Sequence, residues 1–144
     1  MNKHRLWIPA LMLLLAMAAT GQTHELKANK QVGALMHIQP DDSPQAGVET
    51  IAWFGLVKRG GEPVRLAECE CGLSIYKGKA AVGKAIVVPR LREGRVEGEV
   101  GSKDRLLADV TFPQAGPYTL VLTGKPKESG RFAPFKFKWV VRAT

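Results

Sequence analysis

The chain has 144 residues, with 21 Lys and Arg against 13 Asp and Glu, and it contains two cysteines. This length suits a single domain, and a hydrophobic content of 45% with charges of both signs excludes a disordered chain. Two cysteines exclude a disulfide-rich scaffold and a four-cysteine zinc site. Three histidines leave little material for an enzyme active site.

Residues 1–18 are predicted to be a secretory signal peptide. Lys3 and Arg5 give the chain a positive start, and an uncharged, mostly apolar run follows over residues 6–19. The alternative is an uncleaved N-terminal helix that anchors the protein in a membrane. The apolar run is shorter than the roughly 20 residues that a spanning helix needs, so cleavage and export are favoured.

The small residues Ala16 and Ala18 fit the −3 and −1 positions of a cleavage site, so we expect the mature chain to begin within residues 19–22. The expected location is the periplasm or the extracellular space. Removal of Lys3 and Arg5 leaves 19 basic residues against 13 acidic ones, a net charge of +6. Such a protein can make peripheral contact with an anionic surface or an acidic envelope partner, although dispersed basic residues also fit simple solubility.

After a polar arm at 19–33, residues 34–144 show the period-2 alternation of β-strands and no long helical pattern. A first strand is predicted at 34–38, followed by a Pro/Asp/Gly-rich turn. A second strand at 48–57 is apolar on both faces, which is typical of a central strand. The third extended region is 64–77.

The second half continues in the same way. A short apolar strand is predicted at 85–88, and the charged stretch 90–104 is interpreted as a loop or irregular edge. Strands follow at 106–112 and 118–123. The last strand, from residue 135, alternates Phe and Trp with Lys.

About seven short strands separated by Gly/Pro turns indicate an all-β fold, an antiparallel immunoglobulin-like β-sandwich. Tyr118 follows a Gly-containing turn and is the candidate for the tyrosine corner of that fold. Trp53 and Trp139 are predicted to be core residues.

Cys69 and Cys71 are the sharpest candidates for chemistry. In an extended strand they share a face with Leu73 and Ile75, and their Cα atoms lie about 6.6–6.8 Å apart. That spacing is at the upper limit for a disulfide. Three interpretations stay open: core thiols or a structural disulfide, a soft-metal site, and a redox pair.

A soft-metal site would take Cys69 and Cys71, joined by His37 and Met36 if the first and third strands meet in space. Thiolate and thioether ligands favour copper. The mature chain carries no nucleophile, phosphate-loop or zinc-protease motif, so a noncatalytic protein is expected. Nucleic-acid binding is not expected, because the basic residues lack interleaved aromatic residues.

The leader, the Gly60-Gly61-Glu62-Pro63-Val64 turn and the segment 115–120 (Ala-Gly-Pro-Tyr-Thr-Leu) resemble small exported immunoglobulin-like proteins. The resemblance is to YtkA-like and CopC-like periplasmic domains, some associated with copper handling, and to exported proteins of cyanobacterial type. The Cys-x-Cys pair departs from the usual histidine and methionine ligands of CopC-like proteins. The sequence therefore predicts an exported, noncatalytic β-sandwich that binds a soft metal such as copper. The alternative is an interaction module of an envelope or membrane complex, with a basic surface.

Overall fold

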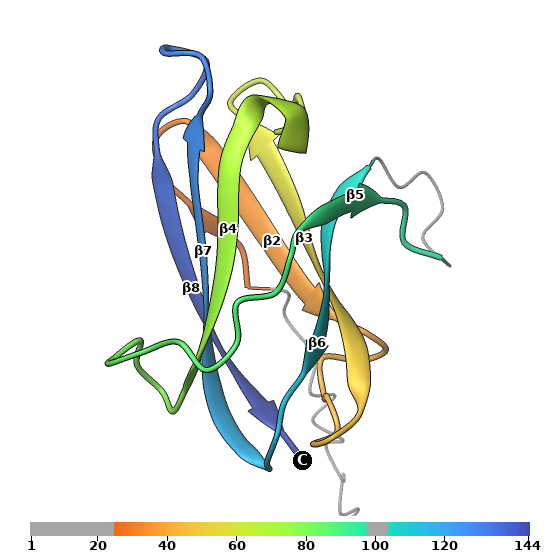
Figure 1. The fold of residues 1–144 in the computed structure, drawn as a ribbon. Helices are drawn as coiled ribbons and strands as arrows, with labels where there is room; N and C mark the ends of the chain where they lie inside the picture. Colours follow the sequence, from red (N-terminus) through yellow and green to blue (C-terminus); the bar gives the residue numbers. More distant parts are fainter. Residues whose placement is uncertain (1–24, 98–103) are drawn as a thin grey trace, which may run out of the picture.

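A computed structural model describes residues 25–97 and 104–144 as two packed β-sheets (Figure 1). Those residues form eight strands and one short 3-10 helix. The strands are β1 (Lys27–Ala28), β2 (Val32–Ile38), β3 (Glu49–Lys58), β4 (Cys69–Lys77), β5 (Arg92–Gly94), β6 (Arg105–Thr111), β7 (Gly116–Pro126) and β8 (Phe135–Ala143), and the helix is η1 (Leu66–Glu68).

The strand order confirms the predicted sandwich. One sheet has the order β1-β2-β3-β6-β5, the other has the order β4-β7-β8, and all the pairings are antiparallel. With β1 set aside, these are the two sheets of the seven-stranded immunoglobulin constant-type fold. β3 lies between β2 and β6, as its apolar composition predicts.

The main core fills the space between the sheets, and β8 shows how the sequence builds it. Phe135, Phe137 and Trp139 are buried, whereas Lys136 and Lys138 are exposed. Because side chains alternate between the faces of a strand, this pattern sends the aromatic rings inward and the lysines into water. The predicted register of this strand is confirmed.

The tyrosine corner is also confirmed. The Tyr118 hydroxyl donates to the Gln114 carbonyl oxygen at 2.8 Å and accepts from the Gln114 backbone N–H at 3.1 Å. Tyr118 is buried against Phe112, with 5.0 Å between the ring centroids. The corner fixes the turn that leads from β6 into β7.

Three predicted segments differ from the structure. The region 64–77 begins as the 3-10 turn η1, and the strand starts only at Cys69. The predicted strand at 85–88 makes one isolated bridge, from Val87 to Ile75 on β4. The charged stretch 90–104 contains a short edge strand, β5, because its backbone pairs with β6 although its side chains show no apolar period.

The polar arm contributes to the fold. β1 lies within it and pairs with β2. The indole N–H of Trp139 donates to the Glu25 carbonyl oxygen at 2.9 Å, which ties the arm to β8. The predicted leader, 1–18, lies outside the described residues. Across 25–97 and 104–144, no helix is long and apolar enough to cross a membrane.

Candidate functional site

Cys69 and Cys71 form a disulfide at the start of β4. Their Cα atoms lie 5.3 Å apart, which is shorter than the spacing in a regular extended strand and falls in the usual range for a disulfide. Cys69 is buried and Cys71 is half-buried against the core. In this form neither sulfur is a thiolate, so metal binding by the pair would require its reduction.

A glycine leaves room for this disulfide. Gly124, on the middle strand β7, is paired with Cys71 on one side and with Phe135 on the other. A Cβ atom on Gly124 would lie 3.0 Å from the Cys69 Sγ atom and 2.3 Å from the nearest Phe135 ring carbon. The sulfur and the ring therefore share the space that this glycine leaves empty.

The two glutamates beside the cysteines are ion-paired. Glu68 lies 2.8 Å from the Lys58 amine, and Glu70 lies 2.9 Å from the amine of Lys125. The hydrogen bond from Lys58 is the main cause that lowers the pKa of Glu68, and partial burial opposes it. Each carboxylate therefore has a lysine partner in the folded protein.

Met36 and His37 are consecutive residues of β2 and point to opposite faces of the larger sheet. Met36 is buried in the main core, whereas His37 lies on the outer face with its ring centroid 5.2 Å from that of Trp53. The His37 Nδ1 atom lies 3.0 Å from the Asp42 carboxylate.

The structure brings the two cysteines together and keeps His37 apart from them. The cysteines lie on β4 of the smaller sheet, and His37 faces away from the space between the sheets. The condition for a four-ligand site, that the first and third predicted strands lie side by side, is not met. Within the described part of the chain, no group of three or more His, Cys, Asp or Glu side chains is placed to hold a metal ion.

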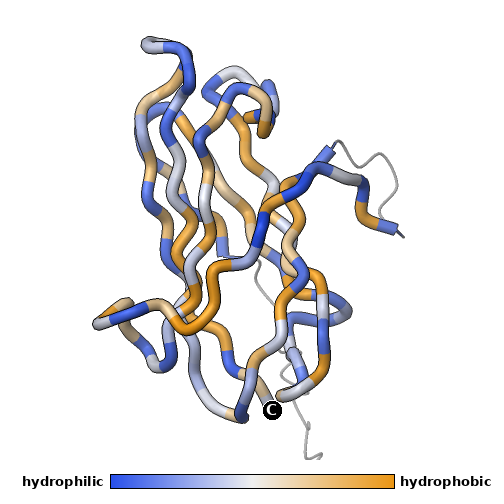
Figure 2. Tube along the Cα trace, in the orientation of Figure 1, coloured by the Kyte–Doolittle hydropathy of each residue, from blue (hydrophilic) through white to orange (hydrophobic). Residues whose placement is uncertain are grey.

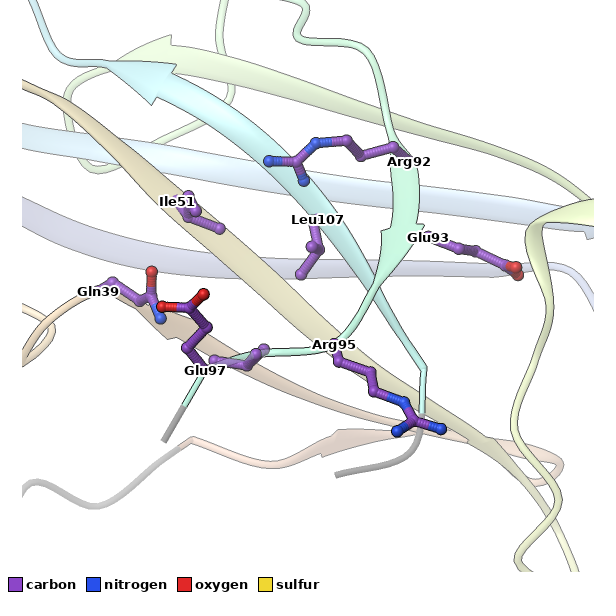
Figure 3. A pocket seen from close by; sticks show the side chains of 8 residues that line it. Gln39, Ile51, Arg92, Glu93, Arg95, Glu97 and Leu107 are labelled. Atoms are coloured by element: carbon purple, nitrogen blue, oxygen red, sulfur yellow. The ribbon is translucent and has the colours of Figure 1, made fainter. Parts of the chain in front are cut away.

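Two adjoining cavities, of about 340 and 670 Å³, lie on the outer face of the larger sheet and share the lining residues Gln39, Ile51, Val96 and Glu97. Figure 3 shows the side chains that line the smaller one. In Figure 3, Ile51 lies between the Gln39 and Glu97 side chains and Arg92. The rim carries charges of both signs, so it selects no ligand charge.

Trp53 belongs to this outer face. It is buried, as predicted, but against Val96 and Leu107 in a second, smaller apolar cluster and not in the main core. The Arg105 guanidinium covers its ring, 5.2 Å from the centroid. The prediction missed this cluster because Val96 lies in a stretch rich in charged residues that shows no apolar period.

Among the described residues, the two most exposed large apolar side chains lie in the connection between β4 and β5. Val82 is 78% exposed and Val88 is 70% exposed, and Ile86 is exposed nearby. Figure 1 shows the connection projecting away from the body of the sandwich, and Figure 2 shows hydrophobic stretches at its tip and along its return. We call residues 77–90 the docking edge.

Hydrogen bonds fasten the docking edge to the smaller sheet at both ends. The Gly78 N–H donates to the Pro117 carbonyl oxygen, and the Thr119 hydroxyl donates to the Gly78 carbonyl oxygen, both at 2.8 Å. On the return, the N–H of Ile75 donates to the Val87 carbonyl oxygen at 2.8 Å. Val87 packs against the core, and Ile86 remains exposed.

The docking edge is also uniformly basic. Lys77, Lys79, Lys84 and Arg90 are exposed, and the sequence has no acidic residue between Glu70 and Glu93. The sequence prediction treated part of this segment as a strand and did not single out its exposed side chains. The signal that could have revealed them is the acid-free run in which basic and small apolar residues are interspersed.

Comparison with known proteins adds a structural likeness. No family model matches the chain, and no curated protein matches it. A crystal structure of a DUF4426 family protein from Pseudomonas aeruginosa PAO1 is similar, with a TM-score of 0.48 and 15% sequence identity over 81% of this chain and 96% of that one.

Proposed function

We propose that the protein is an exported, noncatalytic β-sandwich module that attaches to a partner in the cell envelope through the docking edge, residues 77–90. The observation that carries this proposal is the exposure of Val82 and Val88 among basic side chains. Exposed apolar side chains that gather in one basic segment favour a binding surface, whereas single scattered ones do not. The predicted signal peptide, residues 1–18, supports a location in the cell envelope.

Folding alone does not account for these side chains. Val87 covers the edge of β4 and packs against the core, so it supplies the contact that the sandwich needs. Val82 and Val88 make no comparable contribution to core packing, because most of their surface stays in water. Polar residues at these two positions would leave the bridge to β4 intact.

The charge of the docking edge indicates an acidic partner. Four exposed cations lie within residues 77–90, and the nearest acidic residues along the chain are Glu70 and Glu93. Glu70 is paired with Lys125, and Glu93 is paired with Arg65. Neither carboxylate is therefore available to neutralise the edge, which favours association with negatively charged surfaces.

Binding to an isolated envelope fraction tests the proposal. We expect the purified protein to sediment with the fraction, and we expect the Val82→Ser/Val88→Ser double variant to lose most of that binding. Val48→Ser is the matched control, because Val48 is 51% exposed in the turn between β2 and β3. Equal binding by the wild type, the double variant and the control would refute the proposal.

A soft-metal function is the second candidate, and the adjacency of Cys69 and Cys71 favours it. Reduction of the disulfide would give two thiolates on one strand, which prefer Cu(I) over Zn(II). We expect reduced protein to bind about one Cu(I) per chain, and either Cys→Ser variant to lose tight binding. His37→Ala should leave binding unchanged, because His37 lies on the far face of the other sheet. A competition titration that gives the wild type and the serine variants equal affinity would remove this candidate.

A further inference from the structure

We infer that the partner of the docking edge is an anionic lipid bilayer. In this arrangement Val82 and Val88 enter the boundary between headgroups and acyl chains, and the lysine amines contact lipid phosphates. The inference rests on the proposed function and names the chemistry of its partner.

The amino-acid composition of the docking edge favours lipid over protein. Residues 77–90 contain three lysines and one arginine with small aliphatic residues, and they contain no aromatic residue. The centre of a protein–protein interface is enriched in Tyr, Trp, Phe and Arg and depleted of Lys. At a bilayer surface, by contrast, lysine stems lie along apolar surface while the amines stay at the headgroups.

Basic and apolar side chains are interspersed along the docking edge, which suits a flat, layered partner. Lys79 and Lys84 flank Val82 along the chain, and all three side chains are exposed. Arg90 follows Val88 on the return, so each exposed valine has a cation within three residues. A bilayer surface offers apolar chains and phosphates side by side, so it can receive both kinds of side chain.

The fold holds the docking edge ready for binding. Its ends are hydrogen-bonded to Pro117 and Thr119 on β7 and to Ile75 on β4. Gly78 and Gly83 have φ angles of 97° and 76°, a conformation that glycine adopts without strain and that lets the chain turn within the docking edge. A segment fastened in this way loses less conformational entropy on binding than a free loop does.

The size of the electrostatic contribution can be anticipated. Each Lys or Arg close to an anionic bilayer contributes about 1 kcal/mol, which corresponds to roughly a fivefold change in affinity. Neutralising Lys79 and Lys84 should therefore weaken binding about 25-fold. Binding should also weaken as salt is added, because exposed charges are screened.

Flotation with lipid vesicles tests the inference, using protein with its disulfide intact. The vesicles contain about 30% phosphatidylglycerol in phosphatidylcholine, or phosphatidylcholine alone. We expect binding to the anionic vesicles only, weakened about 25-fold in Lys79→Gln/Lys84→Gln. We expect no change beyond twofold in the control Lys125→Gln/Lys127→Gln, whose lysines lie at the opposite end of β7.

Two results would overturn the inference: equal binding to both kinds of vesicle, or equal binding by the Lys79/Lys84 variant and the wild type. The envelope-fraction experiment separates this failure from failure of the proposed function. Valine-dependent binding to the envelope without binding to anionic vesicles would identify an acidic protein as the partner and leave the function standing. Envelope binding that does not depend on Val82 and Val88 would refute both.

Discussion

Replacement of Gly124 by alanine tests the packing around the disulfide. The added Cβ atom would lie 2.3 and 2.6 Å from two Phe135 ring carbons and 3.0 Å from the Cys69 Sγ atom. Ordinary carbon–carbon contacts need about 3.5–4.0 Å, so either the ring or the strand must move by more than 1 Å. Phe135 cannot move freely, because it is buried and stacked on Phe137 with 5.2 Å between ring centroids.

Two opposing effects set the change in unfolding free energy that we expect for Gly124→Ala. Overpacking of this kind costs about 1–3 kcal/mol. Replacing a glycine restricts the unfolded chain, which raises the free energy of unfolding by about 0.5–1 kcal/mol. We therefore expect Gly124→Ala to lower the free energy of unfolding by about 1–2 kcal/mol, which moves the urea midpoint by about 0.5–1 M.

Gly72→Ala is the matched control, because Gly72 is paired with Thr123, the residue before Gly124, and has room for a Cβ atom. Its added Cβ atom would meet nothing closer than the Thr123 Oγ1 atom, at 3.7 Å. We expect this variant to be as stable as the wild type or slightly more stable. In the Gly124→Ala background, Phe135→Leu should cost less than it does in the wild type. Equal urea midpoints for the two alanine variants would refute the packing described here.

Three further predictions concern the fold. Phe137→Ala should cost about 3–5 kcal/mol of unfolding free energy in chemical denaturation, and Lys138→Ala should stay within about 0.5 kcal/mol; similar midpoints would show that the register of β8 is wrong. Tyr118→Phe should cost about 1–2 kcal/mol through its lost corner hydrogen bonds, and an unchanged melting temperature would contradict that role. Glu68→Gln should cost less than about 1 kcal/mol at neutral pH, because the ion pair with Lys58 lowers the pKa of Glu68 and so stabilises the fold above the ordinary pKa of glutamate. The difference from the wild type should disappear as the pH falls through that lowered pKa, and a difference that grows in acid would contradict the assignment.

Alternation was enough to predict most strands because each has one face in the core. β8 is the clearest case, with Phe137 inside and Lys138 outside. The same rule failed for Trp53, which follows the strand pattern but is buried on the outer face. Its cover comes from Val96, whose position depends on backbone pairing between β5 and β6. Side-chain pattern carries little information about such pairing.

The candidate metal site shows a similar limit. The period of a strand already separates Met36 from His37, since consecutive side chains point to opposite faces. The predicted immunoglobulin-like fold also puts its first and third strands in different sheets, as β2 and β4 are here, so the four-ligand site conflicted with the predicted fold itself. The spacing of Cys69 and Cys71 in the sequence did not decide whether they form a disulfide. The bond requires a shorter Cα–Cα distance than a regular strand gives, and the residue types do not reveal that shortening.

Fluorescence from a label on the docking edge tests the central claim most directly. Both native cysteines are in the disulfide, so a Val82→Cys variant can be labelled selectively with an environment-sensitive dye. Ser129→Cys places the same dye in the exposed β7–β8 turn at the other end of the sandwich. On addition of vesicles containing about 30% phosphatidylglycerol, we expect a blue shift for the label at residue 82 and none at residue 129. A blue shift at residue 129 alone, or at neither position, would contradict attachment of the docking edge to an anionic bilayer.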